Sequence, residues 1–223
     1  MKRGTIMKGR FVTFEGADGA GKTTALKRLF SLITPELRKR ILLTREPGGN
    51  SIAEQIRRVI LAPRNVRMDP KTEALLYAAA RRQHLVQTIV PALCHGQLVF
   101  CDRYVDSSIA YQGGGRKLGD AFVRRLNQSV TGGLQPELTI YFCLPVRVGL
   151  DRINHHRTND IDRLDRETVA FHQRVHVAYQ RLVKQNPRRI KVVDATQSVS
   201  KVTDQVLQIL NRHFQINFED YNG

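Results

Sequence analysis

Residues 11–24 read Phe11-Val12-Thr13-Phe14-Glu15-Gly16-Ala17-Asp18-Gly19-Ala20-Gly21-Lys22-Thr23-Thr24. A short apolar run leads into the pattern G-x-x-x-x-G-K-[ST], and apolar residues at helical spacing follow it. Glycines let the backbone of such a loop curl so that successive N–H groups face an anion, and the following helix adds its partial positive charge. The pattern is a P-loop, and it predicts a site for the phosphates of a nucleoside triphosphate.

The P-loop also predicts which residues contact ATP. The Lys22 ammonium is expected to meet the β- and γ-phosphates, and the Thr23 hydroxyl is expected to bind Mg²⁺. The full set of expected ATP contacts is Gly16, Ala17, Asp18, Gly19, Ala20, Gly21, Lys22, Thr23 and Thr24. Motors, GTPases, helicases and small-molecule kinases all use P-loops, so the motif alone leaves the class of protein open.

Short runs rich in β-branched or aromatic residues recur along the chain, with helix-period sequence between them. The runs are residues 10–14, 41–44, 97–101, 138–142 and 190–193. Strands joined by helical crossovers run parallel and are covered on both faces, so the pattern predicts a three-layer α/β/α sandwich. Ligands are expected at the carboxyl ends of its strands.

Length and composition indicate a single domain in a reducing compartment. The chain has 223 residues and 41% hydrophobic residues, enough for one well-packed core. Its three cysteines are scattered and lack the spacing of a zinc site, which favours a cytoplasmic protein without disulfides. The longest apolar run, residues 74–80, is far below the roughly 20 residues of a membrane-spanning helix. Residues 1–9 are expected to form a flexible leader.

The loop after the second strand and the helix over residues 72–84 carry candidate binding residues. Arg45 lies in the segment Thr-Arg-Glu-Pro-Gly-Gly, where proline and two glycines permit a sharp, fixed backbone. In the helix, Tyr77 and Arg81 are four residues apart and share one face, opposite an expected core face of Leu75, Ala79 and Val86. An aromatic ring beside a guanidinium suits a nucleotide. The alternatives are an ordinary turn and a packed tyrosine.

The loop after the third strand carries a charge pair. Asp102 is expected to hold Mg²⁺, directly or through water, while Arg103 clamps a second phosphate; a plain ion pair is the alternative. Ser108 and Gln112 are four apart on the helix that follows, so their polar groups point the same way and together suit the edge of a base.

Residues 151–166 are polar and dense in charge, and they are predicted to form a lid, with a solvated loop as the alternative. A mobile segment that bears arginines excludes water and neutralises charge during phosphoryl transfer.

The class of P-loop protein follows from what accompanies the motif. We find no Asn-Lys-x-Asp element for reading guanine, and the third strand ends in Asp-Arg rather than in an Asp-Glu pair that would activate water. A small-molecule kinase needs neither. The net charge of +16 attracts any polyanion, but the arginines are dispersed in ones and twos, so nucleic acid is not a required partner.

Five segments together resemble the bacterial thymidylate kinases, P-loop nucleoside monophosphate kinases. They are residues 14–24, 44–49, 73–82, 102–113 and 162–165. The resemblance implies ATP-dependent phosphorylation of dTMP to dTDP, which serves dTTP synthesis. It also implies the P-loop kinase fold with a five-stranded parallel sheet, Mg²⁺ and a homodimer.

The resemblance also implies roles for single residues. Asp18 would accept from the sugar 3′-hydroxyl, Arg103 would clamp the acceptor phosphate, and Tyr77 would stack on the base, where many relatives have phenylalanine. Arg45, Arg81, Ser108 and Gln112 correspond to the remaining dTMP contacts. Because Gly19 rather than arginine follows Asp18, the chain is similar to the subgroup whose catalytic arginines lie in the lid, and Arg157 and Arg163 are the candidates. The alternatives are another nucleoside monophosphate kinase and a nucleic-acid-associated P-loop ATPase.

Overall fold

The computed structural model describes residues 9–156, 163, 164 and 166–221 of the chain. Within them, five strands form one sheet in the order β2-β3-β1-β4-β5, and every neighbouring pair runs parallel. The strands are β1 (Arg10–Gly16), β2 (Ile41–Arg45), β3 (Leu98–Asp102), β4 (Leu138–Cys143) and β5 (Ile190–Asp194). All five predicted strands are confirmed.

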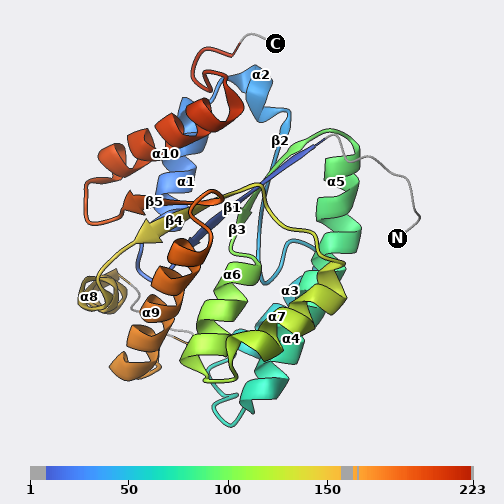
Figure 1. The fold of residues 1–223 in the computed structure, drawn as a ribbon, viewed down its shortest axis with the longest axis vertical. Helices are drawn as coiled ribbons and strands as arrows, with labels where there is room; N and C mark the ends of the chain where they lie inside the picture. Colours follow the sequence, from blue (N-terminus) through green and yellow to red (C-terminus); the bar gives the residue numbers. More distant parts are fainter. Residues whose placement is uncertain (1–8, 157–162, 165, 222–223) are drawn as a thin grey trace.

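Helices cover both faces of the sheet (Figure 1). On one face α1 (Lys22–Leu32) packs beside α10 (Val199–Phe214), and on the other lie α9 (Val169–Gln185) and the η1–α5 segment, residues 85–94. The remaining helical segments are α2 (Pro35–Arg38), α3 (Ser51–Leu61), α4 (Pro70–His84), α6 (Val105–Ser108), η2 (Ile109–Gly115), α7 (Asp120–Thr131) and α8 (Val146–His156), while η1 is Leu85–Ile89 and α5 is Val90–Cys94. The expected three-layer α/β/α sandwich is confirmed.

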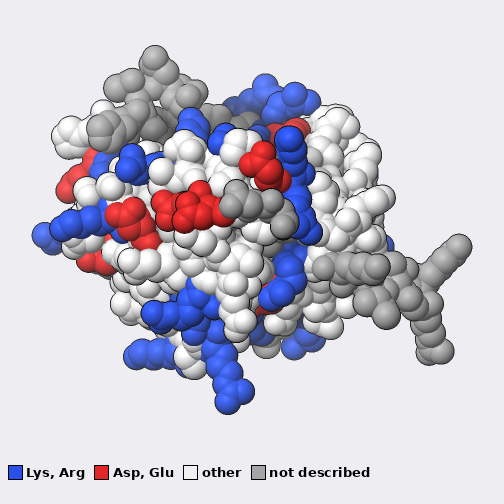
Figure 2. Space-filling model, turned by 90° about the horizontal axis from the view of Figure 1, so that it is seen from above, with Lys and Arg blue, Asp and Glu red and all other residues white. Residues whose placement is uncertain are grey.

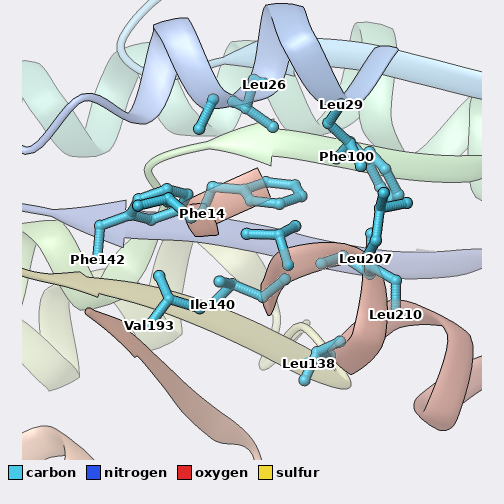
Figure 3. Close-up of a cluster of buried hydrophobic side chains, with 14 of the residues drawn as sticks. Phe14, Leu26, Leu29, Phe100, Leu138, Ile140, Phe142, Val193, Leu207 and Leu210 are labelled. Atoms are coloured by element: carbon cyan, nitrogen blue, oxygen red, sulfur yellow. The ribbon is translucent and has the colours of Figure 1, made fainter. Parts of the chain in front are cut away.

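Side chains of β1 alternate between the two faces, as a doubly covered strand requires. Val12 and Phe14 pack toward α1 and α10, whereas Phe11 packs with η1 and α5. Figure 3 shows the first of these cores, in which the Phe14 and Phe100 rings meet edge to face with their centroids 5.2 Å apart. Each such ring contributes about 1.5–3 kcal/mol by burial, so β1 is fixed rigidly where it enters the P-loop.

Register brings the ends of three strands together. Arg45 of β2 and Phe14 of β1 both pair with Asp102 of β3, so the loops that follow these strands leave the sheet side by side. This edge of the sheet is where the sequence places the site.

Helix α4 presents its faces differently from the prediction. Leu75 of α4 and Val86 of the following η1 are 54% and 44% exposed, whereas the side of α4 that carries Glu73 and Arg81 is buried. Tyr77 and Arg81 do share a face, but that face points into the molecule, so the assignment of Leu75, Ala79 and Val86 to the core is wrong. The buried side of α4 is polar because it meets other charged side chains.

Several predictions concern residues at the limits of the described chain. Residues 1–8 of the expected leader lie outside the described residues, whereas the Gly9 amide donates to the Leu93 carbonyl at 2.8 Å. Of the expected lid, residues 151–156 complete α8, while 157–162 and 165 lie outside the described residues. Among the helices of the described chain, none is long and apolar enough to cross a membrane.

Candidate active site

The P-loop leaves β1 at Gly16, and α1 begins at Lys22. The buried Lys22 ammonium turns back onto the loop and donates to the carbonyls of Gly16 at 3.0 Å and Ala17 at 3.1 Å. Burial and the neighbouring Arg103 charge lower the pKa of Lys22 to about 8. A phosphate in this loop would supply the negative charge that the buried ammonium needs.

Helix α8 lies directly against the P-loop. Gly19 has a φ of +74°, which side chains rarely adopt, and a Cβ there would overlap the Gly149 carbonyl of α8. From the next turn of α8, Arg152 donates to the Gly19 carbonyl at 3.4 Å and to the Ala195 carbonyl at 3.2 Å. No side chain at position 19 fits while α8 is in this place, so an arginine from the P-loop itself is excluded.

Asp18 and Arg103 connect the P-loop to the loop after β3. Arg103 Nη2 donates to Asp18 Oδ1 at 2.6 Å, and Arg103 Nη1 donates to the Gly16 carbonyl at 3.0 Å. The other Asp18 oxygen accepts from the Tyr111 hydroxyl at 2.7 Å. Arg103 is one of few non-glycine residues with a positive φ, 68°, and such strain persists where the surroundings hold it.

Glu15 fixes the backbone next to Arg103. One oxygen of this buried carboxylate accepts from the Tyr104 amide at 2.8 Å and from the Ser107 amide at 3.3 Å, which fixes the start of α6 just after Arg103. The other accepts from the hydroxyls of Ser107 and Tyr179 at 2.6 and 2.8 Å. Burial, with the charge of Asp106, raises the pKa of Glu15 to about 7 in spite of these bonds.

Thr23 and Asp102 face the same cavity at the P-loop, and their oxygens suit Mg²⁺. Asp102 Oδ1 is buried and has no hydrogen-bond partner within the described part of the chain. A buried carboxylate oxygen without a donor carries a large desolvation cost, which a cation offsets. The residues present therefore fit a magnesium ion.

Arg81 is held on every side. Its Nε donates to Glu46 at 2.7 Å, its Nη1 to Ser108 at 3.1 Å and to Asn127, and its Nη2 to the Tyr104 carbonyl at 3.2 Å. Glu46 is in turn bonded to His84 at 3.1 Å. Because this network is buried, Arg81 is presented to the cavity in one fixed orientation.

Glu73 is the centre of a second buried network. It accepts from Gln112 Nε2 at 2.8 Å, from Arg116 Nε at 3.1 and 3.2 Å, and from Arg163 Nη2 at 2.6 Å. Arg163 also donates to the Ile60 carbonyl at 2.9 Å and is 5% exposed. Arg163 therefore lies between α3 and α4 in this structure and lines neither cavity at the P-loop.

Two cavities meet at the P-loop, and the predicted residues divide between them. The first is lined by ten predicted residues: Asp18, Lys22, Thr23, Arg45, Tyr77, Arg81, Asp102, Arg103, Ser108 and Gln112. The second is lined by Asp18, Gly19, Ala20, Gly21, Lys22, Thr23 and Thr24, together with residues of α8 and of the β5–α10 loop. Gly16 and Ala17 line neither cavity, and their carbonyls accept from the Lys22 ammonium. Arg157 lies outside the described residues.

Sequence reasoning missed several residues of the site. They are Glu15, Glu46, Arg57, Glu73, Tyr111 and Arg152. Glu15 is the next-to-last residue of β1 and Glu46 comes directly after β2, and these positions at the carboxyl ends of strands were a usable signal. Glu73 and Arg152 carried no signal, because their partners are distant in sequence.

Basic side chains form no single continuous surface on the face shown in Figure 2. They gather in separate groups with acidic side chains between them. The net charge of +16 is therefore distributed rather than concentrated there.

Comparison with known proteins connects this geometry to one family. Residues 14–206 match the family model described as thymidylate kinase. The chain is 55% identical over 205 residues to a thymidylate kinase of Lactiplantibacillus plantarum, covering 92% of this chain and 93% of that one. It is 55% identical over 209 residues to one of Lacticaseibacillus casei (93% and 98%), and 53% identical over 212 residues to one of Enterococcus faecalis (95% and 100%).

Proposed function

The chain belongs to the thymidylate kinase family, and from this premise we propose how its residues carry out the family's reaction. The protein is a phosphotransferase that phosphorylates dTMP to dTDP with ATP and so serves dTTP synthesis. One observation supports the residue assignments most directly: the two cavities share Asp18, Lys22 and Thr23. A donor in one and an acceptor in the other would meet at the P-loop.

On the donor side, ATP occupies the second cavity. The amides of residues 16–24 face its phosphates, and the Lys22 ammonium leaves the Gly16 and Ala17 carbonyls to bind the β- and γ-phosphates. Thr23 and Asp102 would hold Mg²⁺, directly or through water, and the bound ion would supply positive charge for the phosphate oxygens.

On the acceptor side, dTMP occupies the first cavity. Arg103 binds its 5′-phosphate, and Asp18 accepts from the 3′-hydroxyl, so both exchange part of their mutual bond for substrate. Tyr77 stacks on thymine. Arg45, Arg81, Ser108 and Gln112 contact the phosphate and the base, and all four line the cavity.

The transfer is direct and in line. The acceptor phosphate has its second pKa near 6 and is largely ionised at neutral pH, so no side chain has to remove a proton. Catalysis then depends on positioning two anions and neutralising their charge, which Lys22 and Arg103 do from opposite sides.

Residues 151–166 form the lid of one P-loop kinase domain. When this lid closes, Arg157 and Arg163 neutralise charge on the transferred phosphoryl group. For Arg163 this requires that its ion pair with Glu73 breaks. The exclusion of a side chain at Gly19 supports the assignment of this task to the lid.

The protein acts as a cytoplasmic homodimer, with no membrane or nucleic acid required. Three free cysteines in the described chain fit a reducing compartment. Helices α3 and α4 pack together, and with η1, which follows α4, they expose Ile52, Val59, Leu75 and Val86, an apolar surface of the kind that a second subunit covers. Analytical ultracentrifugation of the wild type and of Leu75→Glu tests this interface; a monomeric wild type contradicts it.

The deciding experiment measures ADP release with dTMP, dUMP, AMP, CMP and GMP. We expect dTMP to support the fastest turnover. Preference for another monophosphate contradicts the acceptor assignment, and ADP release stimulated by DNA or RNA alone contradicts the kinase assignment as a whole.

A further inference from the structure

Glu73 lies behind the wall of the acceptor cavity rather than in it. Its side chain is fully buried on α4, and it does not line the cavity, whereas its partner Gln112 on η2 does. The bond between them runs from Gln112 Nε2 to Glu73 Oε1 at 2.8 Å. The route from Glu73 to the base therefore passes through the Gln112 amide, whereas its ion pair with Arg163 leads toward the lid.

A carboxylate can accept hydrogen bonds but cannot donate them. Burial raises the pKa of Glu73, but the bonds from Arg116 and Gln112 and the charge of Arg163 outweigh burial and hold the pKa below its usual value. Glu73 is thus ionised, and the amide end that faces it must be the NH₂ group. This orientation follows from the chemistry of the two groups, since an ionised carboxylate can face only the donating end of the amide.

The opposite end of the same amide is the carbonyl oxygen Oε1. The two ends of an amide diverge from one carbon, so with Nε2 on Glu73 the oxygen is turned away from it. Within the described part of the chain, no residue donates to Gln112 Oε1. Gln112 accordingly offers the cavity an acceptor.

Arg81 offers a donor to the same cavity. Its Nη2 carries two N–H bonds, and the described residues supply one acceptor for them, the Tyr104 carbonyl at 3.2 Å. Both residues line the same cavity. A donor and an acceptor on the wall of one cavity match thymine or uracil, whose O4 accepts and whose N3–H donates. Cytosine presents the reverse, a donating N4 amino group and an accepting N3.

We propose that Glu73 is a positioning residue that sets pyrimidine selectivity: by fixing the Gln112 amide with its carbonyl toward the base, it admits thymine or uracil and rejects cytosine. This inference rests on the proposed function, because it takes dTMP to be the acceptor in this cavity. It adds a residue that never touches the substrate.

The test is Glu73→Gln. In this variant two guanidinium groups still face the former Oε2 position, so the new amide turns its carbonyl toward Arg116 and Arg163 and its NH₂ toward Gln112. Gln112 must then rotate to accept, and it presents its own NH₂ to the base. A donor now faces N3–H of thymine, while N3 of cytosine gains a partner.

The measurement is kcat/KM for dTMP, dUMP and dCMP with saturating ATP. In Glu73→Gln we expect the ratio of dTMP to dCMP to fall by about 10- to 100-fold, while the ratio of dTMP to dUMP stays constant, because those two bases share the same edge. An equal loss of kcat/KM with all three acceptors, or an unchanged ratio of dTMP to dCMP, overturns the proposal.

Arg116→Gln is the matched control, since it removes another partner of Glu73 without changing what faces Gln112. We expect lower thermal stability with unchanged selectivity; a loss of selectivity equal to that of Glu73→Gln overturns the proposal. A wild type that does not phosphorylate dTMP refutes the proposed function instead, so the two failures are distinguishable.

If Glu73→Gln does not fold, neutron diffraction of the wild type with dTMP decides the question. Amide deuterons of Gln112 directed at Glu73 support the proposal, and deuterons directed at the base overturn it.

Discussion

Arg103 and Asp18 are joined by a bond of 2.6 Å between Nη2 and Oδ1, although they are 85 residues apart. The bond ties the loop after β3 to the P-loop at the point where the two cavities meet. Each partner keeps further contacts when the bond is exchanged: Arg103 still has the Gly16 carbonyl, and Asp18 still has Tyr111. The site is thus assembled before either substrate arrives.

Arg103→Ala should weaken the acceptor side selectively. We expect KM for dTMP to rise about 10- to 150-fold, the equivalent of about 1.5–3 kcal/mol for a hydrogen bond to a charged group, with a smaller change in KM for ATP. Initial-rate kinetics with each substrate varied in turn measures both. Arg181→Ala, which removes only an exposed ion pair with Asp120, is the control and should change neither value. Equal effects on both substrates would contradict the assignment.

Lys22→Ala should lower kcat by about 10²–10³-fold, the usual loss for one charge-stabilising donor. In the wild type, kcat/KM for ATP should decline above about pH 8, because the lowered pKa of Lys22 lets the free enzyme lose this proton and with it a positive charge. Lys22→Arg should show no such decline, since arginine stays charged. A wild-type profile that is flat to pH 9.5 would refute this account.

Glu15→Gln should change how stability depends on pH. The pKa of Glu15 is raised to about 7 in the folded state, so the folded protein retains a proton that the unfolded chain loses at lower pH. Its contribution is therefore fully present below the unfolded pKa and is lost as pH rises toward 7. Relative to Glu15→Gln, the wild type should lose on the order of 3 kcal/mol at most between pH 4.5 and 7.5. Urea denaturation of both proteins across this range gives the difference, and a constant difference would contradict it.

Asp102→Asn should raise the Mg²⁺ concentration required for half-maximal activity, because the buried Oδ1 loses its charge toward the ion. Chelation by EDTA should abolish wild-type turnover, and added Mg²⁺ should restore it. Titration of activity with Mg²⁺ at fixed ATP measures the shift. An unchanged midpoint in the variant would remove Asp102 from the metal site.

The two lid arginines should differ when each is changed to alanine. Arg163→Ala breaks a buried ion pair with Glu73, so we expect a loss of about 3 kcal/mol in the free energy of unfolding together with a lower kcat. Arg157→Ala should lower kcat without changing stability by as much. Chemical denaturation and single-turnover kinetics on both variants separate the effects. If Arg163→Ala keeps the wild-type kcat, this side chain anchors the lid and takes no part in transfer.

Much of the fold could be predicted, because the signals are local. Each strand is a short β-branched or aromatic run, and the P-loop motif marks where β1 ends. The carboxyl ends of parallel strands lie at one edge of the sheet, which is why the sequence predicts that Arg45, Asp102 and the P-loop lie together. This rule alone is enough to predict where the loops after β2 and β3 lie.

Apolar periodicity failed on α4 for a physical reason. The buried face of this helix carries Glu73, Arg81 and His84, which bond to polar partners from distant segments. A pattern of hydrophobic residues cannot reveal a buried side that is polar, so Leu75 and Val86 were assigned to the wrong face. Similarly, Ser108 and Gln112 do line one cavity, but the π-helical η2 rather than a regular α-helix carries Gln112.

The contact between Gly19 and Gly149 sets a limit on sequence change in this protein. Bare main chain meets bare main chain there, so neither position has spare volume, and an alanine at either would push α8 and the phosphate-binding amides apart. The first turn of α8, which leads toward the lid, thus packs directly against the P-loop. Any reshaping of one segment, by evolution or by an engineer, has to be matched by the other.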